Sequence, residues 1–457
     1  MQNIYEEVAS LDKRCYDNFH LTEDILMEHA ANGMASFIRE KFPLSSTVVI
    51  VVGSGNNGAD GIALARLLHK DYHVSLLYAK APKSPMAQLQ HKRSLAIGVA
   101  NSSSLDNCDV IVDAIVGTGF SGTFSHNIET LLHAMNKSDA YKIACDVPSG
   151  YVFKADTTLT MGALKKAMFL DRHKDVVGDI KVLDLGVARS VYELPTSWHL
   201  LDLNDMQLPT RNTQDTHKGS FGHLAVISGE KTGASILCSL SALHFGSGLV
   251  TLVGFDNEKT LHLPYSLMYA HTLPKNTTAI ACGMGLGENF TQKELLALLP
   301  STTPLILDAD ILSNSCIVEL LKRDNIVLTP HPKEFVTLLQ LLGLADISVE
   351  TLQNERFKYV EMFAHHYPDV TLLLKGANVI ITHHGQFYIN PHGNAKLAKG
   401  GSGDVLAGLI GALLAQNYTP LQAAITASLA HTQLANGYTG ADFSLTPEDL
   451  IAGIGKL

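Results

Sequence analysis

The chain has 457 residues, of which 46% are hydrophobic and 17% are charged, and its formal net charge at pH 7 is −10. This length is too great for one ordinary core and predicts two or three domains, while the composition excludes a disordered chain. The negative charge argues against nucleic-acid binding through a basic surface, because neutralising phosphates needs clustered lysine and arginine.

Three features bear on where the protein works. The 6 cysteines show no C-x-x-C spacing and mostly lie in apolar runs, which is typical of buried thiols in a reducing compartment. Residues 1–20 carry acidic side chains early and no apolar segment, so no secretory signal is expected. No apolar run approaches the ~20 residues of a membrane span. We therefore expect a cytoplasmic enzyme without a membrane segment.

The chain begins with two stretches of helical character, residues 3–18 and 22–41. Residues 47–52 form a β-branched run typical of a buried parallel strand. A glycine-rich turn, residues 53–61, follows this strand and leads into a leucine-bearing helix. Strand, glycine turn and helix in this order place a dinucleotide or phosphate at a helix amino end.

The same unit recurs in the first half, with strands at 73–78, 109–115 and 141–146 and a helix at 86–97. This alternation predicts a doubly wound α/β sheet, in which the carboxyl ends of the strands meet at one edge. Polar, glycine-bearing loops follow three of the strands, at residues 53–61, 117–122 and 147–150. We therefore expect these loops to face a single crevice.

Residues 203–218 are polar and without a clear period, which indicates a domain boundary. We place it so that the domains are residues 1–203 and 204–457. The second domain is again predicted to be α/β, with a helix at residues 234–245. Its predicted strands are 222–229, 249–253, 278–281, 304–307, 325–328, 370–374, 379–381 and 386–389.

The loop at residues 399–404, K-G-G-S-G-D, precedes an apolar run that predicts a helix starting at Asp404. Glycines let backbone N–H groups turn toward an anion, and an aspartate beside them can accept a hydroxyl proton. A flexible glycine loop with a capping aspartate is the alternative. Neither a Walker-type motif nor a protein-kinase signature is present. The loop resembles the G-x-G-D anion hole of the ribokinase-like superfamily.

Six motifs in one order narrow this resemblance. They are KGSFG (218–222), GMGLG (283–287), LDAD (307–310), TPHPKE (329–334), KGAN (375–378) and GGSGD (400–404). Together they closely resemble the NAD(P)H-hydrate dehydratase family. That family removes water from hydrated nicotinamide cofactors and uses a nucleotide, ADP in bacterial members and ATP in eukaryotic ones, to phosphorylate the hydroxyl.

The first half resembles the NAD(P)HX epimerase family, which interconverts the R and S hydrates. The motifs are GNNGADG (55–61), DAIVGTG (113–119) and DVPSG (146–150). The two resemblances imply a Rossmann-like doubly wound sheet followed by a ribokinase-like α/β domain. They also imply one enzyme, both isomerase and lyase, that epimerises R- and S-NAD(P)HX. It would dehydrate the S form to NAD(P)H at the expense of ADP, forming AMP and phosphate.

The epimerase resemblance assigns residues to the first site. Asp146 would contact the hydrated ring and perform acid–base work; a turn-capping aspartate is the alternative for Asp113 and Asp146. The potassium ligands would be Asn57, Asp113 and Ser149. The residues that would bind NADPHX are Asn56, Asn57, Gly58, Ala59, Asp60, Gly117, Thr118, Gly119, Phe120, Ser121, Gly122, Thr123 and Asp146.

The dehydratase resemblance assigns the second site. Asp404 would activate the ring hydroxyl, and Ala234, Gly285 and His331 would line the NADPHX pocket with it; a surface histidine and solvated lysines are the alternative interpretations. Mg²⁺ is expected with ADP, without a clear ligand set in the sequence. The nucleotide would be held by Lys375, Gly376, Ala377, Asn378, Val379, Asn394, Lys399, Gly400, Gly401, Ser402 and Gly403.

Two departures from the epimerase pattern stand out: Ala59 replaces a glycine, which is tolerable if its φ is negative, and the proline usual before Lys165 is missing. Two other hypotheses stay open, a ribokinase-like small-molecule kinase and a first half that only binds. The choice between ADP and ATP, and between NADHX and NADPHX, is open at this point. We expect a homo-oligomer acting on small molecules.

Overall fold

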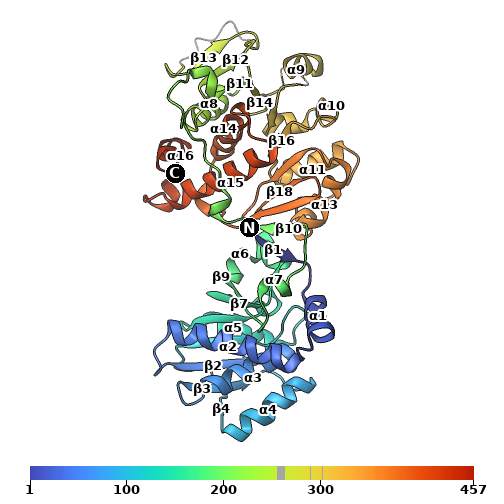
Figure 1. Cartoon of the computed structure of the whole chain (residues 1–457), viewed down its shortest axis with the longest axis vertical. Helices are drawn as coiled ribbons and strands as arrows, with labels where there is room; N and C mark the ends of the chain where they lie inside the picture. Colours follow the sequence, from blue (N-terminus) through green and yellow to red (C-terminus); the bar gives the residue numbers. More distant parts are fainter. Residues whose placement is uncertain (255–262, 289, 301) are drawn as a thin grey trace. The chain divides into compact units, whose positions relative to one another are not determined.

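The computed structural model describes residues 1–254, 263–288, 290–300 and 302–457. The chain divides into two compact units, Asn3–Thr196 and Met1–Gln2 with Ser197–Leu457 (Figure 1). The boundary between residues 203 and 204 stays a prediction. None of the helices in the described part of the chain combines the length and apolar character needed to cross a bilayer.

The first unit is built on a parallel sheet with strand order β4-β3-β2-β5-β6-β7-β9. Its strands are β2 (Thr47–Val52), β3 (His73–Tyr78), β4 (Ala100–Asn101), β5 (Val110–Ala114), β6 (Tyr141–Cys145), β7 (Thr157–Met161) and β9 (Asp179–Leu183). The strand order reverses between β2 and β5, and a doubly wound sheet binds its ligand at such a point. The strands predicted at 47–52, 73–78, 109–115 and 141–146 are confirmed.

Helices cover both faces of this sheet (Figure 1). They include α2 (Glu23–Lys41), α3 (Asn56–Leu68), α4 (Pro85–Ile97) and α5 (His126–Lys137). Val48 and Ile50 of β2 pack with α2 and α3, whereas Val49 of the same strand packs with α5. This alternation explains why β2 is apolar throughout, since both of its faces are buried.

The helix predicted at residues 3–18 is wrong at its start. Residues Gln2–Tyr5 form strand β1, and α1 begins only at Ala9 and ends at Phe19. β1 pairs in parallel with β8 (Leu164–Lys165), and Ile4 of β1 is fully buried. Pairing with a strand distant in sequence overrides the local helical pattern here. As a result, Tyr5, four residues before the start of α1, lies beside Lys165.

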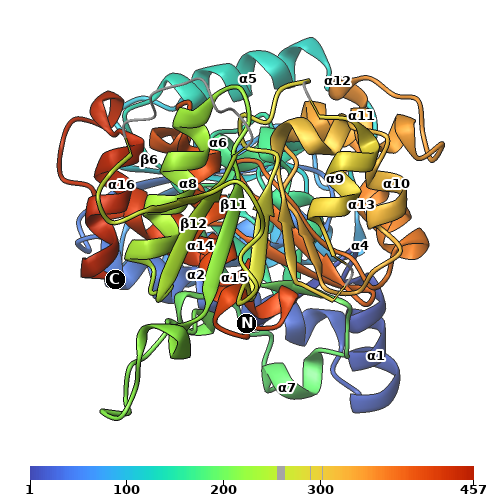
Figure 2. The same cartoon turned by 90° about the horizontal axis from the view of Figure 1, so that it is seen from above.

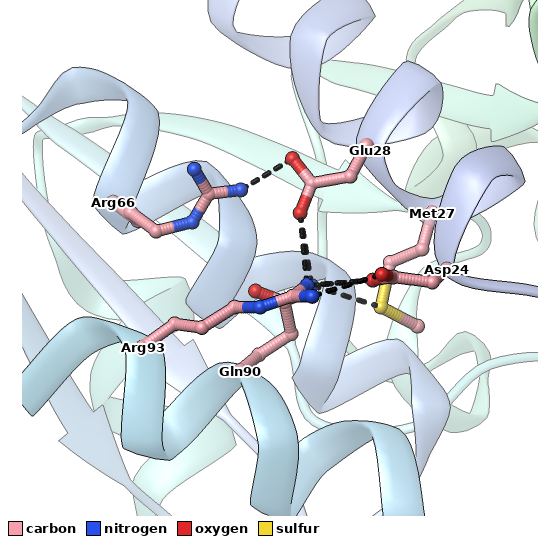
Figure 3. Close-up of polar contacts among 6 residues, drawn as sticks. All are labelled: Asp24, Met27, Glu28, Arg66, Gln90 and Arg93. Atoms are coloured by element: carbon pink, nitrogen blue, oxygen red, sulfur yellow. Dashed lines mark hydrogen bonds and ion pairs between the residues drawn. The ribbon is translucent and has the colours of Figure 1, made fainter.

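Charged side chains join α2, α3 and α4 (Figure 3). Arg93 of α4 binds Asp24 of α2 through both of its terminal nitrogens, at 2.6 and 2.9 Å. Glu28, one turn further along α2, accepts hydrogen bonds from Arg66 of α3 and from Gln90 of α4. Bidentate arginine–carboxylate contacts are geometrically specific, so the Arg93–Asp24 pair orients α4 on α2, and the Arg66–Glu28 contact joins α3 to the same helix. The amino end of α3 is part of the site described below.

The second unit holds a sheet whose described strands run in the order β13-β12-β11-β14-β15-β16-β17-β18-β19-β10. The strands are parallel from β13 to β17 and antiparallel from β17 to β19. Their bounds are β10 (Trp198–Leu200), β11 (His223–Ile227), β12 (Leu249–Val253), β13 (Met268–Ala270), β14 (Ala279–Cys282), β15 (Leu305–Leu307), β16 (Ile326–Leu328), β17 (Thr371–Leu374), β18 (Val379–His383) and β19 (Gln386–Asn390). The strands predicted for this half are confirmed.

The core of this unit is built around α14 (Ser402–Ala415), which packs against α8 (Thr232–His244) and α15 (Pro420–Asn436) (Figure 2). α8 lies against β11 and β12, and α15 lies against β16, β17 and β18. The residues of α14 from Val405 to its end are buried, as expected for a core helix. α14 begins two residues before the predicted start at Asp404. The remaining helices are α9 (Gln292–Leu298), α10 (Ile317–Leu320), α11 (Pro332–Leu341), α12 (Val349–Asn354), α13 (Arg356–His366) and α16 (Pro447–Gly453).

Candidate active sites

A cavity of about 470 Å³ opens at the carboxyl ends of β2, β5 and β6 in the first unit. Sequence-predicted residues line it from all three strand ends. They are Asn56, Asn57, Asp60, Gly117, Thr118, Gly119, Phe120 and Asp146. The expected crevice is confirmed for the loops at 53–61 and 117–122, whereas the end of β6 contributes Asp146 and the loop at 147–150 does not line the cavity. Of the other predicted residues, Gly58 and Ala59 are buried inside α3, and Ser121, Gly122 and Thr123 are exposed beyond the cavity lining.

The amino end of α3 reaches this cavity through Asn56 and Asn57. A side chain at Gly58 would place its Cβ 2.2 Å from the carbonyl oxygen of Gly53, so only glycine fits there. Ala59 lies within the helix, where φ is negative, and its methyl group is fully buried in a cluster with Met27. The free backbone N–H groups and the dipole at the amino end of α3 suit a bound phosphate.

Asp146 occupies a strained position directly after β6. Its φ is +70°, a left-handed conformation that costs a non-glycine residue energy. One carboxylate oxygen, Oδ1, lies 2.6 Å from Nζ of Lys165 and accepts the N–H of Met161 at 3.2 Å. Lys165 is only 1% exposed, so the ion pair is shielded from water on the lysine side. The other oxygen, Oδ2, lies 3.3 Å from the position of a Cβ on Gly117, so a side chain there would crowd the carboxylate.

The three residues expected to hold potassium are all buried. Asp113 accepts hydrogen bonds from the N–H and the hydroxyl of Ser149, at 2.7 and 2.6 Å. Burial nevertheless raises the pKa of Asp113 to about 6. Both polar atoms of the Asn57 amide are buried without a hydrogen-bond partner. An orphaned amide oxygen and a buried carboxylate are suitable ligands for a hard cation, so this set fits K⁺.

Other acidic residues line the cavity that the sequence did not place there. Asp12 comes from α1 and Glu23 from the start of α2. Glu23 accepts a hydrogen bond of 2.5 Å from the side chain of Asn56. Burial and the charges of Asp146 and Asp12 raise the pKa of Asp60 well above its usual value. No local motif marks Asp12, because its position depends on the pairing of β1 with β8.

In the second unit, three of the motif loops meet at one point. Nζ of Lys375, after β17, lies 2.6 Å from Oδ1 of Asp308, after β15. A Cβ on Gly403 would lie 3.2 Å from the same Nζ, which brings the glycine loop to this pair. Burial and the nearby charge of Asp308 raise the pKa of Asp404 to about 6, and Lys375 opposes this rise. Asp308 lies in the LDAD motif at 307–310, to which the family resemblance assigns no site residue.

The glycine loop itself is held from several sides. Gly401 adopts φ +92° against Pro447, and the hydroxyl of Ser402 lies 3.1 Å from Nε2 of His431. Burial and the charge of Lys375 lower the pKa of His431 to about 4, so this histidine is neutral. Lys399, by contrast, donates to the carbonyl of Phe443 at 2.8 Å.

Asn394 donates to the side chain of Asn436 at 2.8 Å. The carbonyl of Ala377 lies 2.2 Å from the position of a Cβ on Gly393, so the loops before and after the β18–β19 hairpin touch. Of the other nucleotide residues expected, Asn378 is buried beside this contact, Val379 begins β18, and Gly376 and Gly400 lie in the two loops. The loop before β18 therefore touches the connection between β19 and α14, which holds Asn394, Lys399 and Gly400.

His331 caps helix α11. Its Nδ1 accepts the N–H groups of Lys333 and Glu334, at 3.1 and 3.3 Å, and Glu334 accepts the N–H of His331 at 2.8 Å. The charges of Lys375 and Asp308 both act on Glu334, whose pKa burial raises. The amino end of α11 therefore lies near the Lys375–Asp308 pair.

Ala234 and Gly285 lie side by side, since a Cβ on Gly285 would be 3.2 Å from that of Ala234. Gly285 has φ +62°, and a side chain there would also collide with the carbonyl of Lys231. Over the described ranges, no three His, Cys, Asp or Glu side chains are grouped so as to hold a metal ion.

Known families match both halves of the chain. Residues 224–454 match the family described as NAD(P)H-hydrate dehydratase, and residues 23–167 match the family described as YjeF-related protein N-terminus. The chain is similar over its whole length to the bifunctional NAD(P)H-hydrate repair enzyme of Helicobacter pylori, with 42% identity and 100% of both chains covered. The Escherichia coli enzyme of the same name is 30% identical, over 93% of this chain and 87% of its own.

Among solved structures, one match is the ADP/ATP-dependent NAD(P)H-hydrate dehydratase from Bacillus subtilis co-crystallised with ATP/Mg²⁺. It is 27% identical, covers 55% of this chain and 92% of its own, and has a TM-score of 0.47.

Proposed function

The chain belongs to the family of bifunctional NAD(P)H-hydrate repair enzymes, and we propose that it repairs hydrated nicotinamide cofactors with the two sites described above. The first unit epimerises R- and S-NAD(P)HX. The second unit dehydrates S-NAD(P)HX to NAD(P)H at the expense of ADP, forming AMP and phosphate. The observation that carries this proposal is the 42% identity to a bifunctional repair enzyme over the full length of both chains.

In the second site, Asp404 acts as the general base. With a pKa of about 6 it is mostly ionised at neutral pH and still basic enough to accept the proton of the ring hydroxyl. The hydroxyl oxygen then attacks the terminal phosphorus of the nucleotide. The carbon–oxygen bond then breaks, the phosphate leaves with its electron pair, and loss of a proton from the adjacent ring carbon to water restores the double bond of the nicotinamide ring.

The residues around Asp404 hold the nucleotide. Lys375, 2.6 Å from Asp308, offers a positive charge to a phosphate, and the turn at 400–403 offers backbone N–H groups at the amino end of α14. Mg²⁺ bound with the nucleotide would neutralise phosphate charge. Lys375–Val379, Asn394 and Lys399–Gly403 bind the nucleotide, while Ala234, Gly285 and His331 bind the hydrated cofactor.

In the first site, the amino end of α3 and the loop from Gly117 to Thr123 bind the phosphates and ribose of NAD(P)HX. Asp146, held by its contact with Lys165, performs acid–base work on the hydrated ring. Asn57, Asp113 and Ser149 hold K⁺, which supplies a positive charge beside the buried Asp113 carboxylate. The protein acts in the cytoplasm as a homo-oligomer.

The test is to supply the purified protein with both epimers of NADHX, Mg²⁺ and either ADP or ATP, and to follow NADH and orthophosphate. We expect Asp404→Asn to lower the rate of dehydration about 10³-fold, as loss of a general base does, with epimer exchange unchanged. Asp346→Asn, an exposed aspartate of the same unit, is the matched control. Full dehydration by Asp404→Asn would contradict the mechanism, and a stable phosphorylated product in place of orthophosphate would indicate a small-molecule kinase.

A further inference from the structure

The epimerase cavity is lined by Asp12 as well as by Asp146. Asp12 belongs to α1. This helix follows strand β1, in which Tyr5 pairs with Lys165 of β8. The charges of Lys165 and Asp146 both act on the Asp12 carboxyl group. Two carboxyl groups from opposite parts of the sequence therefore belong to one cavity, and the proposed mechanism uses only one of them.

Asp12 is held by a buried tyrosine. The hydroxyl of Tyr192, in α7 (Arg189–Tyr192), donates to Oδ1 of Asp12 at 2.7 Å. The Tyr192 ring packs against Gly162, where a Cβ would lie 2.6 Å from ring atoms and where φ is +69°. Gly162 lies in the turn between β7 and β8, and Lys165 in β8 is the partner of Asp146. Tyr192, which holds Asp12, and Lys165, which holds Asp146, thus both depend on the turn at Gly162.

The two carboxyl groups have opposite environments. Nζ of Lys165 lies 2.6 Å from Asp146, whereas Asp12 accepts a hydrogen bond from Tyr192, and burial raises the pKa of Asp12 despite this bond and the charge of Lys165. A pair of carboxyls with such different surroundings is the pattern of an enzyme acid and an enzyme base. The ionisable groups that interact electrostatically or by a hydrogen bond with Asp12 are Glu7, Cys15, Tyr16, Asp60, Asp146, Lys165 and Tyr192.

We propose that Asp12 is a second catalytic residue of the epimerase site, the general acid that works with Asp146 as the base, and that Tyr192 positions it. The assignment rests on the proposed function, since it concerns the same reaction. Inverting a carbon in both directions requires one group that gives a proton and one that takes a proton, with the roles exchanged in the reverse reaction.

Asp12 gives its proton to the hydroxyl of the hydrated ring, and the carbon–oxygen bond breaks as the adjacent ring nitrogen donates its lone pair. Water leaves, and a water molecule adds to the other face of the same carbon as the electron pair returns to nitrogen. The added water loses a proton to Asp146. Nothing is oxidised or reduced, and one proton has passed from Asp12 to Asp146, to be returned through solvent.

The first test is Asp12→Asn in the full-length protein, assayed by conversion of R-NADHX to NADH with ADP and Mg²⁺. We expect kcat for epimer exchange to fall at least about 100-fold while KM stays within about threefold, because a general acid is lost and the cavity is kept. Dehydration of S-NADHX stays unchanged. Asp17→Asn, an exposed aspartate on the same helix, leaves both reactions unchanged.

The second test is Tyr192→Phe, which removes only the hydroxyl. That hydroxyl stabilises ionised Asp12, so its loss raises the pKa of Asp12 and moves the alkaline limb of the exchange profile to higher pH. A purely structural role for Tyr192 would not move this limb. If Asp12→Asn unfolds the unit, the Tyr192→Phe profile alone decides.

The proposal would be overturned if Asp12→Asn exchanged the epimers at a rate within about threefold of the wild type. It would also be overturned if the alkaline limb of the exchange profile did not move in Tyr192→Phe. A wild-type protein that dehydrates S-NADHX but does not exchange the epimers would instead contradict the proposed epimerase function itself.

Discussion

Each of the two units places a lysine–aspartate pair at the carboxyl edge of its sheet, with an N–O distance of 2.6 Å in both. In the first unit, Lys165 is paired with Asp146, the proposed acid–base residue itself. In the second unit, Lys375 is paired with Asp308, which is a neighbour of the proposed base Asp404. The lysine therefore contacts the proposed reacting carboxylate itself in the first site, and a neighbour of that carboxylate in the second site.

This difference suits the two reactions. The Lys165 side chain is 1% exposed and orients the Asp146 carboxylate, whose backbone is in a strained position. The Lys375 side chain is 22% exposed, so it can also meet a nucleotide phosphate. Burial, together with the negative charge of Asp308, raises the pKa of Asp404 to about 6, where the group exchanges protons near neutral pH. In the first unit the lysine–aspartate pair thus orients Asp146, and in the second unit it contributes to the pKa of Asp404.

The comparison is tested most strongly by removing the two lysines separately, as Lys165→Met and Lys375→Met. Each change leaves a mostly buried carboxylate without its partner, and we expect each to lower the free energy of unfolding of its own unit by about 3 kcal/mol. Lys165→Met also lowers epimer exchange about 10²-fold, because Asp146 loses its orientation. Thermal unfolding and separate assays of exchange and dehydration measure these effects.

Each lysine variant is the control for the other. Lys165→Met leaves dehydration of S-NADHX intact, and Lys375→Met leaves exchange intact while raising KM for the nucleotide. Loss of both reactions in either variant would contradict the division of labour between the units.

Much of this architecture could be predicted from the sequence, because buried parallel strands are β-branched runs and their loops are glycine-rich. Strand β2 and the glycine turn after it are examples. The helix predicted from residue 3 was wrong because Ile4 is buried through a strand pair with Leu164, and local periodicity carries no information about a partner so distant. Asp12 was missed for the same reason. Asp146 has a left-handed backbone, and its carboxylate contacts Lys165 and the N–H of Met161; no local sequence pattern indicates either feature.

The second prediction concerns potassium, which only the first site is proposed to use. Replacing KCl by choline chloride at the same ionic strength should lower the melting temperature of the first unit and the rate of epimer exchange. At a K⁺ concentration ten times its Kd, the ion stabilises the folded unit by about 1.4 kcal/mol. Differential scanning calorimetry with the two salts measures the effect.

Asp113→Asn removes the only carboxylate of the proposed ligand set, so it should make the melting temperature independent of the salt. Dehydration of S-NADHX serves as the internal control and should not depend on K⁺. If Asp113→Asn still responds to K⁺ as the wild type does, the ion binds elsewhere.

The smallest expected effect is a shift in a pH profile, and it tests whether Asp404 is tuned by its neighbours. Asp404 must be ionised to accept a proton, so kcat/KM for dehydration rises with pH through about 6. The charge of Asp310 raises the pKa of Asp404, and Asp310→Asn removes that charge. The acid limb should therefore move to lower pH.

The substitution is mild, because an asparagine oxygen can still accept the N–H of Gly287 that Asp310 accepts at 2.9 Å. Asp346→Asn, an exposed change in the same unit, should leave the limb in place, and the exchange profile of the first unit should not move in either variant. A limb that stays at the same pH in Asp310→Asn would mean that burial alone sets the basicity of Asp404. A carboxylate tuned by charges responds to a change in any of them, whereas one fixed by a single buried partner responds only to the loss of that partner. The Asp404 and Asp146 sites should differ in this way.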